Sequence, residues 1–325
     1  MKIAIIGAGN LGTQHARAAL NFGAQIVAVH DARIEAAQKL ADEFGALATT
    51  ELNEVFAHDV DGAVIATPPP IRLEPVRAAC ERGTHLFIEK PPAFDLDEGR
   101  ACLELIENSN IMAAAGFNLR YEKRYEQLRE LIAGREVHLV RTACAINYYL
   151  DFPMAPWFLQ KRVSGGPIAE QAIHLLDCVR YIFGNARARR ALAVGAKNMA
   201  LERAEFDAEN ALQIVYELDN GIFATHLNHC GHEKFHFDLE LIGPHLWLCA
   251  NLTDNCIRGE MDGARVEIPV LPNDEGRLEA WLRALESGDE SLIRAPYRDA
   301  LNTQALVDAA IKSQCTNCFE KVEIP

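Results

Sequence analysis

The chain has 325 residues, which is long for one ordinary hydrophobic core and suits two domains. Its formal net charge of −14 argues against nucleic acids and anionic membranes as partners, since the protein as a whole would repel both. The nine cysteines are scattered, and no apolar run is long enough for a membrane helix, so we expect a cytoplasmic protein without a signal peptide.

The first third of the chain alternates short apolar runs with stretches of helical period. The run KIAIIGAG, for example, is followed by a helical pattern that ends at a glycine. Such strand–helix alternation predicts a parallel sheet covered on both faces by helices. The expected strands are 2–9, 25–31, 62–70, 84–92 and 111–118, and the expected helices are 10–23, 32–45, 71–83 and 95–110.

A different pattern begins after residue 119, where a charged helix is followed by longer β-rich runs. The sequence Asp219-Asn220-Gly221 between two of these runs predicts a hairpin turn. We therefore expect domains over 1–119 and 120–325, the second of them α+β with an open, mostly antiparallel sheet. Its final helix, about 297–313, could pack back on the first domain.

A dinucleotide site is expected at GAGNLG, which begins at Gly7 and has the G-x-G-x-x-G spacing between a strand and a helix. Gly7 permits the tight turn, Gly9 lets the backbone approach a pyrophosphate, and Gly12 lets the helix pack closely in a Rossmann fold. Asp31 ends the second strand, where a carboxylate accepts from the adenosine ribose of NAD and repels the additional phosphate of NADP. Arg33 could pair with that phosphate, so NAD is the expected cofactor and NADP remains possible. The loop residues Asn10, Leu11 and Ala32 complete this part of the expected site.

Ligands of open parallel sheets bind at the carboxyl ends of the strands. Two later strands end in TPP and EKP, and these residues are expected near the nicotinamide. For Lys90, composition alone leaves a surface lysine at a strand end as the alternative. The residues concerned are Thr67, Pro68, Pro69, Glu89 and Lys90.

The motifs GAGNLG, TPP, EKP and GFNLRY, followed by a GG segment and a helix with H-x-x-D, resemble those of the Gfo/Idh/MocA family. The resemblance covers nearly the whole chain. It implies an α/β Rossmann domain, a second domain whose open sheet often forms the subunit contact, and NAD(P)-dependent oxidation or reduction of sugars, polyols and related carbonyl compounds. A homodimer or homotetramer acting on a sugar-like small molecule is therefore expected.

The resemblance also assigns roles to particular residues. Lys90 matches the catalytic lysine, whose cation can hydrogen-bond the reacting oxygen. His174 matches the catalytic histidine, and Glu170, one helical turn earlier, is expected to assist it in proton transfer. Both are expected to face a cleft between the domains, and Asp177 could orient a neighbouring residue or bind substrate.

Four further residues are carried over by position. Pro91 matches a proline whose peptide bond is often cis in the family. Asn118 and Arg120 match the segment that lines the site after the last Rossmann strand, Asn118 toward the cofactor and Arg120 toward the substrate. Trp157 is expected to wall the substrate pocket.

The chain departs from the family at two places. The common form D-x-G-x-H is replaced by Glu170-Gln171-Ala172-Ile173-His174, and Arg72 stands where a histidine is common after TPP. The departures leave the substrate open. Because a fold does not fix function, two alternatives to a dehydrogenase remain: an NAD-dependent glycoside hydrolase that oxidises its substrate transiently, or a non-catalytic NAD-binding regulatory protein.

A cluster of histidines remains in HLNHCGHEKFH. In a continuous strand His226, Cys230, His232 and His236 would share one face, and four such ligands suggest zinc, but Gly231 is expected to break the strand. A subunit or substrate-facing surface, or ordinary sheet residues, are the alternatives, and no metal is expected.

Overall fold

A computed structural model describes residues 1–147, 156–197 and 206–325. The chain divides into two compact units, one of Met1–Phe117 with Glu275–Leu301 and one of Asn118–Asp274 with Asn302–Pro325. The first crossing lies within two residues of the expected boundary. The return of residues 275–301 to the first unit corrects the expected domain 120–325. The final helix contributes its first residues to the first unit and the remainder to the second.

The first unit contains a six-stranded sheet in which every pair of neighbours is parallel. Its order, β3-β2-β1-β4-β5-β6, reverses direction between β1 and β4, which is where doubly wound sheets bind their ligands. The sequence pattern predicted all of these strands except the three-residue β3. The strands are β1 (Lys2–Ile6), β2 (Gln25–His30), β3 (Leu47–Thr49), β4 (Gly62–Ile65), β5 (His85–Ile88) and β6 (Ala113–Ala115).

Four helices of this unit were predicted from the sequence, and two, at 52–55 and 277–287, were not. They are α1 (Asn10–Phe22), α2 (Ile34–Asp42), the short α3 (Leu52–Val55), α4 (Leu73–Cys80), α5 (Leu96–Asn108) and the returning α9 (Arg277–Ser287). Gly23 ends α1 in the left-handed conformation that favours glycine, and the Asp95 carboxylate caps α5 by accepting from the Glu98 N–H.

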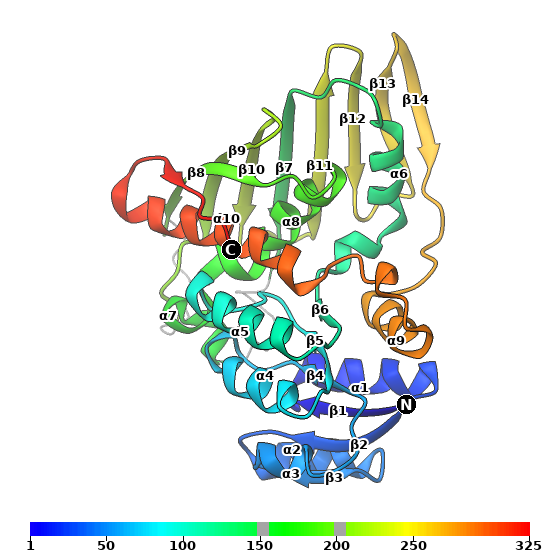
Figure 1. Ribbon diagram of the computed structural model, residues 1–325. Helices are drawn as coiled ribbons and strands as arrows, with labels where there is room; N and C mark the ends of the chain where they lie inside the picture. Colours follow the sequence, from blue (N-terminus) through cyan, green and yellow to red (C-terminus); the bar gives the residue numbers. More distant parts are fainter. Residues whose placement is uncertain (148–155, 198–205) are drawn as a thin grey trace. The chain divides into compact units, whose positions relative to one another are not determined.

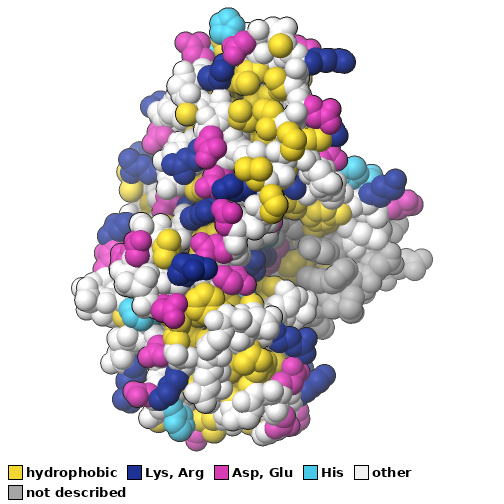
Figure 2. Space-filling model, turned by 90° about the vertical axis from the view of Figure 1, so that its right-hand side faces the viewer, with side chains coloured by type: hydrophobic (Ala, Val, Ile, Leu, Met, Phe, Trp, Pro, Cys, Tyr) yellow, Lys and Arg dark blue, Asp and Glu magenta, His cyan; other side chains and the backbone are white. Residues whose placement is uncertain are grey.

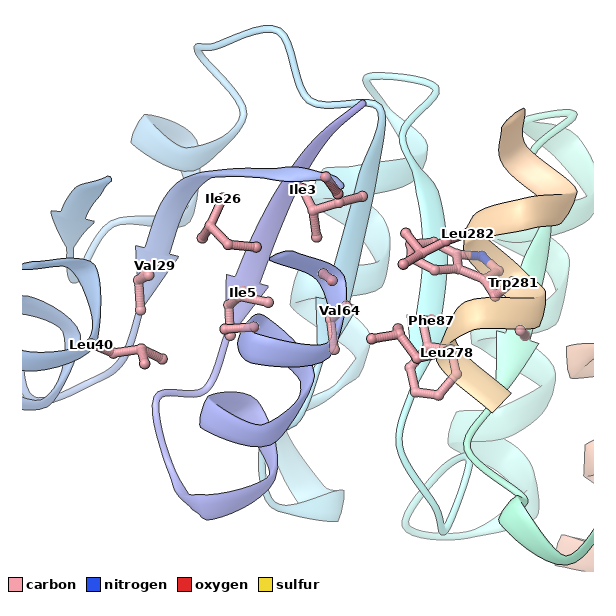
Figure 3. Close-up of a cluster of buried hydrophobic side chains, with 14 of the residues drawn as sticks. Ile3, Ile5, Ile26, Val29, Leu40, Val64, Phe87, Leu278, Trp281 and Leu282 are labelled. Carbon is pink, nitrogen blue, oxygen red and sulfur yellow. The ribbon is translucent and has the colours of Figure 1, made fainter. Parts of the chain in front are cut away.

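The returning helix α9 is part of the core of this unit. Figure 3 shows Leu278, Trp281 and Leu282 of α9 beside Phe87 of β5 and the isoleucines of β1. Trp281 is fully buried, and its ring lies 5.8 Å from that of Phe87. Gly62 leaves room for this indole, since a Cβ there would lie 2.6 Å from the Trp281 ring. Apolar burial of this extent explains why α9 belongs to the first unit.

The second unit contains a nine-stranded sheet in the order β14-β13-β12-β11-β7-β10-β9-β8-β15. All neighbours are antiparallel except β7 and β10, so the expected open, mostly antiparallel sheet is confirmed. The predicted turn at 219–221 joins β9 to β10. The strands are β7 (Leu139–Ala145), β8 (Ala188–Ala196), β9 (Ala211–Leu218), β10 (Phe223–His229), β11 (His236–Gly243), β12 (Leu246–Asn251), β13 (Cys256–Met261), β14 (Ala264–Pro269) and β15 (Glu320–Lys321).

Helices α6 (Lys123–Leu131) and α8 (Ile173–Ile182) lie over one face of this sheet (Figure 1). The opposite face carries an apolar row across four strands. Phe223, Leu139, Ile242 and Trp247 are successive register partners on β10, β7, β11 and β12. Trp247 is 55% exposed and Leu139 is 50% exposed, so this row presents apolar area to solvent in the isolated chain.

Three further elements of the second unit lie near its candidate site or end the fold. They are the short α7 (Lys161–Ser164), the π-helical turn η4 (Ile168–Ala172) and the long α10 (Tyr297–Thr316). In the described parts of the chain, no helix is long and apolar enough to cross a membrane. On the face seen in Figure 2, basic side chains are interspersed with acidic ones, and no broad basic area is visible.

Candidate functional site

The glycine motif after β1 forms a tight turn against the end of β4. Gly7 has φ +102°, and a Cβ on it would lie 2.7 Å from the Ala66 carbonyl oxygen. A Cβ on Gly12 would lie 1.8 Å from the Gly7 carbonyl oxygen, so α1 can approach the strand only with glycine here. Gly9 has no atom within 4 Å of its missing Cβ, which leaves the backbone open to a ligand.

The N-terminus of α1 fits a bound diphosphate. Gly9 is the N-cap and offers no side-chain cap, and no acidic residue lies in the first turn. The first N–H groups of the 13-residue helix, and the positive end of its dipole, are therefore available to an anion. Asn10 is exposed and Leu11 is half-buried at this position.

Asp31 lies beside the same loop. Its Oδ2 accepts from the Ala8 N–H at 2.9 Å, and its Oδ1 accepts from the Arg33 N–H at 3.0 Å. The Arg33 side chain is 76% exposed and lies 3.8 Å from the carboxylate, while Ala32 is also exposed. The expected adenosine-binding residues thus lie together at the carboxyl ends of β1 and β2.

The TPP and EKP segments follow β4 and β5 at the same edge of the sheet. Arg72, which is 2% exposed, joins them by donating to the carbonyl oxygens of Thr67 at 3.0 Å, of Lys90 at 3.4 Å and of Glu89. The Lys90–Pro91 bond is cis, as the resemblance implied, and the Lys90 side chain is half-buried. The buried Thr67 hydroxyl has no hydrogen-bond partner within the described residues, so it remains available to a ligand. Pro68 and Pro69 complete this turn.

The carboxylate of Glu89, which was expected near the nicotinamide, is bound by three protein groups. Its Oε1 lies 2.7 Å from His15 Nε2 and 2.7 Å from Arg277 Nη2, and its Oε2 accepts from the Lys90 N–H at 3.0 Å. Burial alone would raise the pKa of Glu89, but the Arg277 guanidinium and the hydrogen bond from His15 hold that pKa well below its usual range. Both oxygens of the ionised carboxylate are therefore engaged by protein groups.

In the second unit, His174 lies at the start of α8. His174 is partly exposed, whereas every other residue within 166–182 is buried. Its ring lies 6.3 Å from Phe237 of β11 in an edge-on contact, and Phe237 stacks on Phe235 at 5.3 Å. Phe235 is 42% exposed. Sequence reasoning missed both phenylalanines, although their alternation within KFHF was a signal for a shared face.

Glu170 lies in the π-helical turn η4, whereas the sequence predicted a regular α-helix. Turns of this kind occur frequently at functional sites. Glu170 is 5% exposed. The adjacent Gln171 contacts β10 and the residue after it: its Oε1 accepts from Asn228 Nδ2 at 2.9 Å and lies 3.5 Å from Cys230 Sγ. The sheet thus holds the turn that precedes His174.

Arg120 and Asp177, both of them candidate substrate contacts, form a buried pair. Arg120 Nε donates to one carboxylate oxygen at 2.8 Å and Nη2 donates to the other at 2.6 Å, and both side chains are at most 1% exposed. The Thr303 hydroxyl donates to the same carboxylate at 2.8 Å. We assign the pair a structural role. Asn118, by contrast, has a buried Oδ1 without a hydrogen-bond partner among the described residues, which fits its expected ligand contact.

Trp157 is half-buried and packs on a small cluster that contains Phe158, Leu159, Phe206, Ala208 and Cys230. Residues 148–155, which precede it in the sequence, lie outside the described residues.

The histidine cluster does not share one face, because residues 230–235 separate β10 from β11. His226 faces the covered side of the sheet, where its Nδ1 lies 2.9 Å from the Thr142 hydroxyl and burial lowers its pKa to about 4. His236 lies in outward register and contacts the ring of His232. The described residues contain no group of three or more side chains placed to hold a metal ion.

Family models match both units. Residues 1–117 match the model described as "Oxidoreductase family, NAD-binding Rossmann fold", and residues 125–245 match the C-terminal domain model of the same GFO/IDH/MocA family. The glycine loop, the uncapped helix N-terminus and Asp31 fit the cofactor that the first description names.

Among characterised relatives, the chain is 29% identical to inositol 2-dehydrogenase of Rhizobium meliloti strain 1021 over 57% of this chain and 55% of that protein. It is 27% identical to D-glucoside 3-dehydrogenase of Escherichia coli K12 over 69% of this chain and 66% of that protein. The chain thus spans between half and two thirds of these relatives. The solved structure of levoglucosan dehydrogenase in complex with NADH is similar in fold, with a TM-score of 0.85, 18% identity and coverage of 100% of both chains.

Proposed function

Because the chain belongs to the GFO/IDH/MocA oxidoreductase family, we propose that it transfers a hydride between NAD and a hydroxyl or ketone of a sugar, polyol or related compound. The observation that carries this proposal is the carboxyl edge of the parallel sheet. The glycine turn, Asp31, the free Thr67 hydroxyl and Lys90 all follow strands that end at this edge. The nicotinamide supplies the hydride chemistry when it is bound.

In this proposal Lys90 donates a hydrogen bond to the reacting oxygen of the substrate and stabilises the alkoxide that develops there. His174 exchanges the proton, with Glu170 in the preceding turn favouring the charged imidazole. The partial exposure of His174 within a buried helix supports this role. Phe237 and Phe235 would present an apolar surface to the substrate beside His174, and Trp157 remains the proposed pocket wall.

The proposal is tested by incubating the purified protein with NAD and a panel of inositols, free sugars and glycosides, and by following NADH and product. Net accumulation of NADH with one class of substrate supports a dehydrogenase. Cleavage of a glycoside without net NADH would instead identify the NAD-dependent hydrolase. Tight NAD binding without turnover of any compound would favour the regulatory protein.

Asp31→Ala is expected to narrow the preference for NAD over NADP by about tenfold in kcat/KM, because it removes a charge that opposes the 2′-phosphate. Asp31→Asn keeps an acceptor for the Ala8 N–H and should narrow the preference similarly, which separates the charge from loop distortion. Asp42→Ala, at the exposed end of α2, is the control. A wild-type enzyme that prefers NADP would show that Arg33 outweighs Asp31.

We also propose that the chain forms a homodimer or homotetramer through the open face of the nine-stranded sheet. The row Phe223–Leu139–Ile242–Trp247 supplies apolar area at the centre of that face. Trp247→Glu should therefore shift the molar mass from light scattering toward the monomer, whereas Leu20→Glu on α1, equally exposed, should not. A wild-type monomer at micromolar concentration would contradict the proposal.

We propose a cytoplasmic location, because all nine cysteines are free and free cysteines are typical of a reducing compartment.

A further inference from the structure

The main chain of Lys90 is held at both ends by buried groups. Its N–H donates to Glu89 Oε2 at 3.0 Å, and its carbonyl oxygen accepts from Arg72 at 3.4 Å. Arg72 also binds the carbonyl oxygens of Glu89 and Thr67, so the TPP and EKP turns share one guanidinium. The position of the Lys90 backbone therefore depends on where the Glu89 carboxylate lies.

That carboxylate is fixed from three further sides. His15 and Arg277 both contact Oε1 at 2.7 Å. On the remaining side, a Cβ added to Gly116 would lie 2.8 Å from Oε2, so only glycine at this position leaves room for the carboxylate. A buried carboxylate in this position needs a compensating charge, and Arg277 is the permanently charged group that contacts it.

Arg277 comes from outside the segment that matches the NAD-binding domain model. It is the first residue of α9, which returns to the first unit more than 150 residues after that segment ends. Leu278, Trp281 and Leu282 anchor the helix in the core against Phe87, and Phe87 also contacts the ring of His15 at 5.0 Å (Figure 3). The guanidinium thus reaches Glu89 from a helix whose apolar face is buried in the core of the unit.

We propose that Arg277 is a positioning residue for Lys90, which it places by holding the carboxylate of Glu89 against the Lys90 N–H. The proposal rests on the proposed catalytic role of Lys90. It gives α9 a role in the reaction, and residues 1–117, which match the NAD-binding domain model, do not include this helix. Removal of the guanidinium frees the carboxylate to turn, and the Lys90 turn then loses its fixed geometry.

The test compares Arg277→Met, Arg277→Lys and Glu89→Gln with Arg283→Met, an exposed arginine on the same helix that pairs with Glu275. Arg277→Met should lower kcat by about tenfold to a hundredfold, the scale of a small misplacement of a reacting group, with the Kd for NADH nearly unchanged. Arg277→Lys should recover part of the loss, and Arg283→Met should behave as wild type. The double variant Arg277→Met/Glu89→Gln should lose no more than the worse single variant, because both act through one contact.

A second measurement does not depend on turnover. Hydrogen–deuterium exchange by mass spectrometry should show the Lys90 amide exchanging about tenfold faster in Arg277→Met than in wild type or Arg283→Met. Unchanged exchange, or additive losses of kcat in the double variant, would overturn the proposal. If the wild-type protein turns over no compound in the panel, the proposed function fails, while the exchange result still decides whether Arg277 positions Lys90.

Discussion

Lys90→Met is expected to lower kcat by about 10²–10³-fold while leaving the affinity for NAD within about twofold of wild type. This decrease in kcat is the one expected when an enzyme loses one preorganised hydrogen-bond donor to an oxygen that develops negative charge. Methionine keeps the length and apolar character of the lysine stem, so the half-buried side chain can still pack. Because the proposed contact is made to the reacting oxygen, the loss should appear in kcat and not in KM alone.

Two measurements separate this loss from a structural effect. NADH binding, followed by fluorescence titration, should be nearly unchanged, since the glycine loop and Asp31 lie on other strands. Lys39→Met, an exposed lysine on α2 in the same unit, should retain wild-type kcat. If Lys90→Met keeps near-normal kcat, Lys90 is a surface lysine at a strand end, the alternative that composition left open.

The dinucleotide half of the site could be predicted from the sequence because its signals are local. These signals lie within about thirty residues: the glycine spacing, the strand before it and the carboxylate at the end of the next strand. Each has a fixed place relative to the strand or helix that it begins or ends. Gly12, for instance, is required by the contact with Gly7, five residues away. The three-residue β3 was missed because so short a strand carries no period.

The parts that could not be predicted depend on contacts between distant segments. Nothing in the sequence around Glu89 indicates that its carboxylate meets Arg277, which follows it by 188 residues. Arg120 was placed near the substrate by its position in the family motif, and nothing in the sequence shows that its guanidinium pairs with Asp177 in the core. The break within the histidine cluster, by contrast, could be predicted from Gly231, because shared parity holds only within a continuous strand and β10 ends at His229.

His174→Ala is expected to lower the rate of substrate oxidation by about 10²–10⁴-fold, the usual range for a positioned proton-transfer group. The imidazole is the partly exposed group in an otherwise buried helix, so its loss removes the proton acceptor without opening the core. His245→Ala, in the exposed turn between β11 and β12, is the matched control and should leave the rate unchanged. The melting temperature of His174→Ala should stay close to that of wild type, which excludes unfolding as the cause.

Glu170→Gln tests whether the carboxylate and the imidazole act together. Oxidation requires the neutral imidazole as proton acceptor, so its rate should rise with pH as His174 loses its proton. A carboxylate one turn away favours the charged imidazole, and its neutralisation should therefore move that rise to lower pH. Glutamine nearly preserves the shape of the buried Glu170 side chain, so the shift reports the charge. A pH–rate profile that does not move in Glu170→Gln would show that the two residues are not coupled. Near-wild-type kcat in His174→Ala would transfer the proton step to Lys90 or to water, and α8 would then serve only to support the site.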